Sequence, residues 1–177
     1  MIRQRLYILC VFLFFCFCLL TAVTPERRVT ESRPPSAAKV HLLHADRLFF
    51  DDRVHRTAQI LVGNVQLSHE GMLMNCDSAL FYEATNSFDA YGNVHMNQGD
   101  TVLLDSEVFY YNGTDRLARA RHYVVLKHGT MTIYTDSLDY DRLYNLGYFF
   151  EGGRVLDHDN ELTSDWGEYS PVTHEAV

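Results

Sequence analysis

From His41 to Tyr169 the sequence alternates apolar and polar residues with a period of two, which is the pattern of half-buried β-strands. No window of ten or more residues has apolar residues at a spacing of 3.6, and no capped helix start stands out. Clusters of Gly, Asn and Asp recur between the alternating runs, and they supply the positive φ angles of tight turns. The pattern therefore predicts an all-β domain of short strands joined by tight turns.

The expected turns fall into two groups that alternate along the chain. The first group comprises residues 70–71, 98–100, 128–129 and 157–160. The second group comprises residues 84–86, 112–115 and 142–145. We expect each group to lie on its own side of the domain, because consecutive strands run between the two groups.

A repeating unit, whose length of about 30 residues falls in the range of known structural repeats, recurs along the same region. Each copy begins with an Asp that is followed four residues later by an aromatic residue, and Gly-Asn-Val or a variant of it follows further on. The Asp residues are almost evenly spaced and are Asp46, Asp77, Asp105, Asp136 and Asp165. A near-constant period indicates stacked copies of one supersecondary unit, each too small to bury a core alone. We expect an elongated stack, either a β-solenoid or an open antiparallel β-jelly roll.

The alternation also predicts which side chains face the interior. In each copy the second and the fourth residue after the Asp share one strand face. The fourth is aromatic in every copy, and the second is Glu107 in the third copy. The Val of each Gly-Asn-Val shares a face with the apolar residue two positions further on. Stacked copies place like residues about 4.8 Å apart, so these columns form apolar stripes that suit acyl chains. The candidate lipid-binding residues are Phe50, Val65, Leu67, Phe81, Val94, Met96, Phe109, Val124, Leu126, Tyr140 and Val155.

Residues 1–23 form a separate segment. A basic head, Met1–Arg5, precedes an almost uninterrupted apolar run from Leu6 to Val23, an order typical of an export signal. The run is also just long enough for an uncleaved anchoring helix, although we favour cleavage. A lipoprotein signal fits less well, because neither Cys16 nor Cys18 follows the small residues that such a site needs. Residues 24–40 are polar, contain prolines and are interpreted as a linker to a domain at 41–177.

Composition narrows the range of partners. The formal net charge of −8 argues against nucleic acid, which needs a basic face on the protein. Of the four cysteines only Cys76 lies outside the apolar N-terminal segment, so no intrachain disulfide is expected in the domain. The fold must therefore depend on its sheet and core.

Catalysis and metal binding find little support in the sequence. The nine histidines are scattered, and H-E-x-x-H, paired C-x-x-C, G-x-S-x-G and phosphate-binding glycine loops are all missing. The recurring Asp has two interpretations: a ladder of cation ligands, or a side chain that bonds backbone N–H groups where a strand begins. We favour the second, because calcium-binding repeats carry dense glycine loops that this sequence lacks. We expect no enzyme activity and no cofactor.

The recurring unit resembles that of the OstA-like family, the periplasmic LptA-type domains of lipopolysaccharide transport. The resemblance rests on Ala45–Asp51 followed by Gly63–Leu67 and on Asp77–Met96, and it spans about residues 40–170. It implies a twisted, open β-jelly roll in the periplasm that holds lipopolysaccharide acyl chains in its groove. It also implies edge-strand pairing with similar proteins at the inner and outer membranes, or head to tail with further copies. The matching positions are the inward valines and the aromatic column from Phe50 to Tyr169.

Three functions remain open at this stage, and we favour non-catalytic lipid transport. An exported structural or adhesive β-repeat protein would have the same stripes packed into a filled core. A polysaccharide-acting β-solenoid enzyme needs carboxylates clustered on one face, which the scattered acids do not indicate. The sequence stops at Val177, soon after half a copy, which is compatible with a partner at that edge or with a longer protein.

Overall fold

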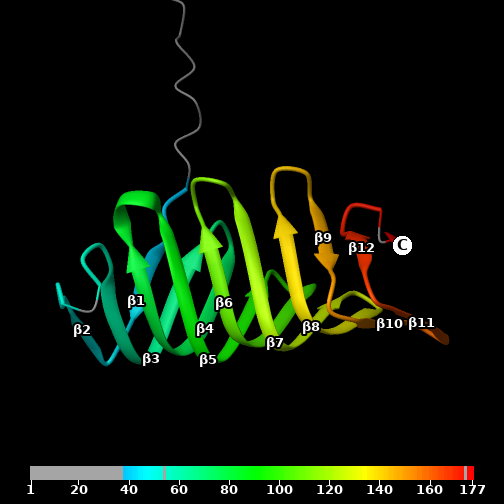
Figure 1. The fold of residues 1–177 in the computed structure, drawn as a ribbon, viewed down its shortest axis with the longest axis horizontal. Helices are drawn as coiled ribbons and strands as arrows, with labels where there is room; N and C mark the ends of the chain where they lie inside the picture. Colours follow the sequence, from blue (N-terminus) through cyan, green and yellow to red (C-terminus); the bar gives the residue numbers. More distant parts are fainter. Residues whose placement is uncertain (1–37, 54, 174) are drawn as a thin grey trace, which may run out of the picture. The chain divides into compact units, whose positions relative to one another are not determined.

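The computed structural model describes residues 38–53, 55–173 and 175–177, and most of them lie in β-strands (Figure 1). The first strands are β1 (His41–His44), β2 (Arg47–Phe49), β3 (Gln59–His69), β4 (Met72–Tyr82) and β5 (Ser87–Gln98). They are followed by β6 (Val102–Asn112), β7 (Leu117–His128), β8 (Met131–Asp141) and β9 (Leu146–Phe149). The last are β10 (Gly153–Asp157), β11 (Asn160–Ser164), β12 (Gly167–Ser170) and β13 (Glu175–Ala176). Within the described ranges the helical structure is one 3-10 turn, η1 (Glu83–Thr85), so the all-β prediction is confirmed.

The predicted export or anchor segment, residues 1–23, and residues 24–37 of the predicted linker lie outside the described residues. Within the ranges that are described, no helix is long and apolar enough to cross a membrane. The last three linker residues lie against the sheet: Val40 is buried and its N–H donates to Asn86 Oδ1 at 2.7 Å. The Asn86 side-chain amide in turn donates to the Ala38 carbonyl at 2.9 Å.

All thirteen described strands belong to one sheet, and its pairs are antiparallel. From β3 to β8 each strand pairs with the next, and the connections lie at the turns that the sequence predicted. This pairing decides between the two expected architectures, because the coils of a β-solenoid stack their strands in parallel. The domain is an open antiparallel β-jelly roll.

The long strands differ from the prediction of short ones. Each of β3 to β8 extends the whole way from one turn to the next. It continues through the position where the sequence suggested that a new strand starts. The register shifts between Val62 and Val65, between Tyr91 and Val94, and again in β7. At each shift two residues lie opposite one on the next strand, which defines a β-bulge. The strands are therefore continuous and bent rather than broken.

Three of the five recurring Asp residues hydrogen-bond residues of these bulges in mid-strand rather than N–H groups at strand starts. Asn93 in the β5 bulge donates its side-chain amide to Asp77 at 2.8 Å, and Asn64 in the β3 bulge bonds Asp46 in the same way at 3.0 Å. In the β7 bulge the backbone N–H of Tyr123 donates to Asp136 at 3.1 Å. These Asp side chains thus bond residues of the bulges, and at Tyr123 the bonded group is a backbone N–H that the bulge removes from the ladder.

Glu107 corrects the predicted alignment of the third copy. It was expected to face the interior, yet it is exposed, whereas Ser106 before it and Phe109 after it are buried. The bulges of β5 and β7 lie beside this point, and β6 shifts its alternation there by one residue, so Glu107 turns outward. Asp77 lies opposite the β3 bulge, and Glu107 lies opposite the β5 bulge. Glu107, and not Asp105, is therefore the structural counterpart of Asp77.

Gly92 offers a test of the bulge geometry. It has a φ of +75°, and a Cβ at this position would lie 2.6 Å from Asp77 Oδ2. We expect Gly92→Ala to lower the free energy of unfolding by about 1–3 kcal/mol, measured by urea denaturation, because it adds a clash to an unfavourable backbone conformation. Gly99→Ala is the matched control, since Gly99 has a φ of +60° but no atom within 4 Å of an added Cβ. Equal losses in the two variants would contradict the role of Asp77.

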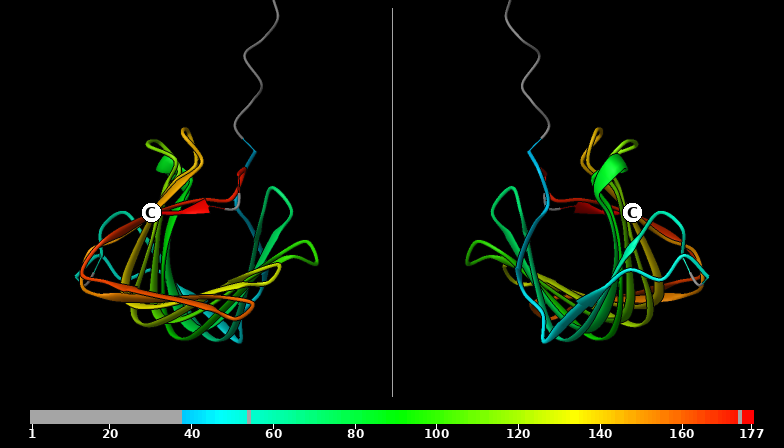
Figure 2. Two further views of the ribbon diagram at one scale, coloured as in Figure 1. Left: turned by 90° about the vertical axis from the view of Figure 1, so that its right-hand side faces the viewer. Right: turned by 90° about the vertical axis from the view of Figure 1, so that its left-hand side faces the viewer.

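The bulges divide the sheet into two walls. At one end β1 pairs with the second half of β3 and β2 with its first half; at the other, β10 pairs with the first half of β8 and β9 with its second half. Wall 1 comprises β1, β10, β11 and the strand halves next to turns 70–71, 99–101 and 129–130. Wall 2 comprises β2, β9, β12, β13 and the halves next to turns 83–86, 113–116 and 142–145. Seen end-on, the sheet curls into a trough (Figure 2).

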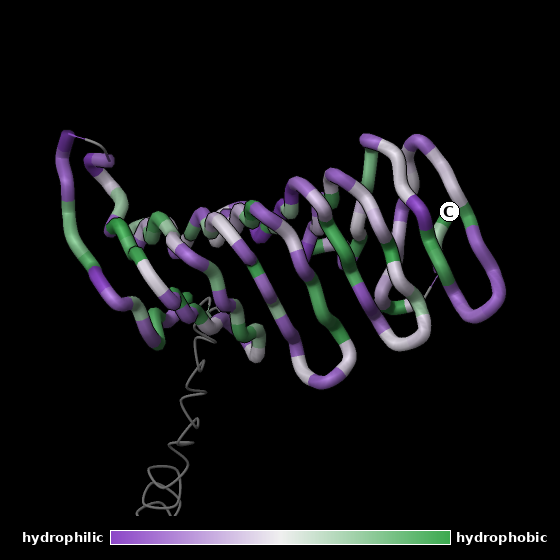
Figure 3. The backbone as a smooth tube through the Cα atoms, turned by 90° about the horizontal axis from the view of Figure 1, so that it is seen from below, coloured by the Kyte–Doolittle hydropathy of each residue, from purple (hydrophilic) through white to green (hydrophobic). Residues whose placement is uncertain are grey.

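The core lies inside this trough. Hydrophobic and hydrophilic positions alternate along the strands (Figure 3), and inward apolar residues of both walls form one buried cluster. Its fully buried large side chains include Phe88, Leu61 and Val65. The sheet therefore packs against itself across the bulge line.

Candidate functional site

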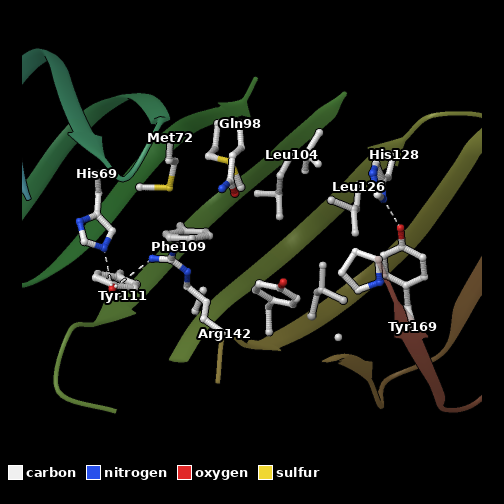
Figure 4. Close-up of a pocket in the computed structure, with 17 residues that line it drawn as sticks. His69, Met72, Gln98, Leu104, Phe109, Tyr111, Leu126, His128, Arg142 and Tyr169 are labelled. Carbon is white, nitrogen blue, oxygen red and sulfur yellow. Dashed lines mark hydrogen bonds between the residues drawn. The ribbon is translucent and has the colours of Figure 1, made fainter. Parts of the chain in front are cut away.

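An apolar cavity of about 100 Å³ lies between the two walls (Figure 4). Its apolar lining comprises Met72, Met96, Val102, Leu104, Phe109, Tyr111, Ala118, Leu126, Leu138, Tyr140 and Tyr169. Single strands contribute to both walls: Leu104 and Phe109 of β6 lie on either side of the point that faces the bulges of β5 and β7. These bulges are thus the local features that fold one strand around the cavity.

The structure places most of the predicted inward residues in the interior. The buried ones are Val65, Leu67, Phe81, Val94, Met96, Phe109, Val124, Leu126 and Val155, and Tyr140 is half-buried. Among these, Met96, Phe109, Leu126 and Tyr140 line the cavity. The other buried residues pack in the core away from it, so they support the trough without lining its open space. Lipid binding by the set stays a prediction.

Phe50 does not lie in the interior, and its predicted inward position is wrong. It follows the end of β2 and is 56% exposed. β2 is a three-residue edge strand, and Leu48 is also exposed, so the inward alternation does not extend to this edge. Phe50 instead lines a shallow surface depression with Lys39 and Phe81.

Polar residues lie at two ends of the cavity, and of these the sequence predicted only Tyr169, as the last member of the aromatic column. His69, Tyr111 and Arg142 lie at one end, and His128 and Tyr169 lie at the other (Figure 4). The alternation itself carried a signal for three further lining residues. The inward positions that hold Val65 and Leu67, Val94 and Met96, and Val124 and Leu126 continue two residues further along each strand. Those positions hold His69, Gln98 and His128, and all three line the cavity. Gln98 and His128 were assigned to turns because a glycine follows each of them, and His69 directly precedes the predicted turn 70–71.

These polar residues link the rims of the two walls. His69 Nε2 is 2.8 Å from the Tyr111 hydroxyl, which also accepts a hydrogen bond from Arg142 Nη1 at 3.4 Å. Arg142 forms an ion pair with Glu70, beside His69 on the opposite rim. At the other end His128 Nδ1 is hydrogen-bonded to the Tyr169 hydroxyl. The trough is thus closed across its open side by side chains and not by the backbone ladder.

His69 makes the stability of the domain depend on pH. Burial lowers the pKa of its imidazole from the ordinary value of 6.5. Below that value the unfolded chain binds more protons than the folded one, so the free energy of unfolding falls as the pH decreases. We expect the urea midpoint to be lower at pH 5.5 than at pH 7.5, and His69→Gln to reduce this difference. An unchanged difference in the variant would assign the pH dependence to other groups.

A comparison with known protein families identifies the family of this chain. Residues 37–177 match the sequence profile of the OstA-like protein family. The chain belongs to the OstA-like family. The resemblance seen in the repeated unit is therefore confirmed, and the match extends over the whole described part of the chain.

The OstA-like domain is also similar in fold to a solved structure. This is LptH, the LptA-homologous periplasmic component of the lipopolysaccharide transport device from Pseudomonas aeruginosa, with a TM-score of 0.50 and 14% sequence identity. The match covers 58% of this chain and 75% of LptH. At this identity the likeness concerns the fold. No curated protein matches the sequence.

The OstA-like domain leaves strands at both ends of the sheet with one unpaired side. Within the described residues β1 and β2 each pair only with β3, β11 pairs only with β10, and β13 pairs only with β12. Leu48 and Phe49 in β2 and Leu162 in β11 are exposed apolar residues on these edges. Unpaired edges of this kind accept a further strand from another chain.

The chemistry of the site is that of an amphipathic pocket. Its walls are apolar, its ends carry imidazole, phenol and guanidinium groups, and its rims carry one ion pair. Among the described residues no group of three or more His, Cys, Asp or Glu side chains is placed to hold a metal ion. The arrangement suits a ligand that has both apolar chains and polar groups.

Proposed function

We propose that this protein is a non-catalytic periplasmic carrier in lipopolysaccharide transport that holds acyl chains between the two walls of its OstA-like domain. One observation carries the proposal: an apolar cavity runs between the walls and is closed across the open side by side-chain contacts. Membership of the OstA-like family and the fold similarity to LptH support the same interpretation. The apolar N-terminal segment supports export from the cytoplasm.

The walls must part before acyl chains enter. A cavity of about 100 Å³ is smaller than the roughly 150 Å³ cavity that takes one benzene molecule. Opening costs the rim contacts, each worth about 0.5–1.5 kcal/mol as a typical hydrogen bond. Burial of each methylene stabilises the complex by about 0.8 kcal/mol, so a few methylenes offset the loss of one contact. The continuous strands at the bulge line keep the walls joined during opening.

We propose that the edge strands are the contacts with other proteins of the transport system. The edge formed by β1 and β2 and the edge formed by β11 and β13 lie at opposite ends of the sheet (Figure 1). Partners of the same β-jelly-roll type at the inner and outer membranes would add their own strands there. Head-to-tail association of two copies would use the same edges and make the troughs continuous.

Equilibrium binding to the purified full-length chain tests the carrier function. We expect labelled lipopolysaccharide to bind saturably, and unlabelled lipopolysaccharide to displace it. The matched competitor is the same molecule with its acyl chains removed, which should not displace the label. Equal competition by the deacylated polysaccharide would contradict acyl-chain binding.

An exported structural or adhesive protein is the second candidate. It is favoured by the complete burial of core residues such as Val65, Leu67 and Val94, which leave no space on their side of the trough. A filled, rigid core would bind no lipopolysaccharide at any concentration. Absence of saturable binding by the folded protein would therefore move this function to first place.

A further inference from the structure

We propose that the rim of the trough carries a binding site for the phosphate group of an amphiphile whose acyl chain occupies the apolar cavity. The inference rests on the proposed carrier function and specifies the headgroup chemistry of the ligand. It starts from a second, polar pocket of about 140 Å³ that is lined by residues of both rims. Three residues line both this pocket and the apolar cavity, namely His69, Tyr111 and Arg142. One amphiphile can therefore occupy both spaces.

The polar pocket has a positively charged lining, although the chain as a whole is negatively charged. Its lining holds two arginines, Arg116 and Arg142, and one carboxylate, Glu70, whereas the whole chain has a net charge of −8. The pKa of the buried His69 is lowered, so its imidazole is neutral at pH 7 and adds no charge. Within the described part of the chain, no ion pair of Arg116 is formed. The pocket thus offers uncompensated positive charge beside an apolar cavity.

The backbone fixes the two arginines close to each other. Arg116 ends the turn between β6 and β7, and Arg142 begins the turn between β8 and β9. The backbone N–H of Arg142 donates to the Arg116 carbonyl at 3.0 Å, which ties the two turns together. Guanidinium groups bind phosphate through two parallel, charge-assisted hydrogen bonds.

Glu70 occupies the position that a phosphate would take on Arg142. Its carboxylate pairs with Arg142 Nη2, and the two side chains are 42% and 24% exposed. A partly exposed pair of this kind contributes little to stability, so a dianionic phosphate can displace it. The Tyr111 hydroxyl, which already contacts Arg142, lies within reach of the same phosphate. Displacement of Glu70 would also free one of the contacts that hold the rims together, which couples headgroup binding to opening.

Short-chain lipids of matched structure test the site on the full-length chain. The probes are dihexanoyl phosphatidic acid, dihexanoylglycerol and inorganic phosphate, with affinities measured by calorimetry. We expect phosphatidic acid to bind about tenfold more tightly than the uncharged lipid. The double variant Arg116→Gln/Arg142→Gln should lose this preference, so that its affinities for phosphatidic acid and for dihexanoylglycerol become equal within twofold. Arg154→Gln is the control, because Arg154 is an exposed wall-1 arginine outside the pocket.

The outcomes separate the phosphate site from the carrier function. Equal affinity of the native chain for the two lipids, or a preference that persists in the double variant, would overturn the phosphate site and leave the acyl-chain groove standing. Failure of the folded chain to bind either lipid would overturn the groove and the site together. Inorganic phosphate should compete with phosphatidic acid and not with dihexanoylglycerol. Arginine-dependent binding of inorganic phosphate without any preference for phosphatidic acid would identify a free-phosphate site and contradict the amphiphile.

Discussion

Replacement of Phe88 by alanine is expected to lower the free energy of unfolding by about 3–5 kcal/mol. Phe88 is fully buried on the inner face of wall 2. Its ring centroid lies 6.0 Å from that of Phe109 and 5.6 Å from that of Tyr111. Truncation removes a large apolar surface from the core and leaves a cavity that continuous, hydrogen-bonded strands cannot close. Urea denaturation at pH 7.5 measures the loss.

The control for Phe88→Ala is an outward residue of comparable size. Leu103 in β6 is 36% exposed, and Leu103→Ala should cost less than half as much. A loss below about 1 kcal/mol for Phe88→Ala would mean that wall 2 is loosely packed at this point. The conclusion that Phe88, Phe109 and Tyr111 pack tightly in one core would then be wrong.

The second large effect concerns binding. Ala118→Phe places a ring in the cavity of about 100 Å³, because Ala118 is a buried residue of β7 that lines it. We expect lipopolysaccharide affinity to fall on the order of thirtyfold, which corresponds to two or three methylenes excluded from the groove at about 0.8 kcal/mol each. The competition assay with labelled lipopolysaccharide measures the change.

Leu103→Phe is the matched control for Ala118→Phe, because it adds aromatic area on the outer face of the neighbouring strand β6. It should leave affinity unchanged within twofold. The added ring of Ala118→Phe should cost no more than about 1–3 kcal/mol in stability, and urea denaturation verifies that the variant is folded. Native affinity in a folded Ala118→Phe variant would place the acyl chains outside this cavity.

The sequence predicted the turns and most of the inward stripes for a simple physical reason. Gly, Asn and Asp mark positions with special backbone angles, and the period of two marks the faces of a strand. Both signals are local, so turns such as 70–71 and 142–145 lie where they were expected. The Val and Leu columns in wall 1 were equally clear, because no bulge interrupts the alternation between Val65 and Leu67 or between their counterparts.

The errors arise where one strand pairs differently along its length. The bulges of β5 and β7 shift the alternation of β6, which lies between them, by one residue, and this turns Glu107 outward. Gly92 and Asn93 look like a strand start, yet they lie in the middle of β5. Phe50 fits the aromatic column, but its strand ends one residue earlier at the edge of the sheet. These features depend on the neighbouring strand, and one strand's sequence does not encode them.

The cavity itself is also beyond a local pattern. Its shape depends on how closely wall 1 and wall 2 approach, and on contacts between residues far apart in the chain. His69 and Tyr111 are 42 residues apart, and Glu70 and Arg142 are 72 residues apart. Alternation identified the inner face, but the distance between two inner faces is a tertiary property.

Photo-crosslinking in cells at two adjacent residues of β6 tests the central claim most directly. Leu104 is 4% exposed and lines the cavity, whereas its neighbour Leu103 is 36% exposed on the outer face. With a photoreactive residue at each position in turn, we expect lipopolysaccharide adducts at 104 and none at 103. Adducts at 103 alone, equal adducts at both, or none at 104 in the folded protein would contradict acyl-chain transport through the trough.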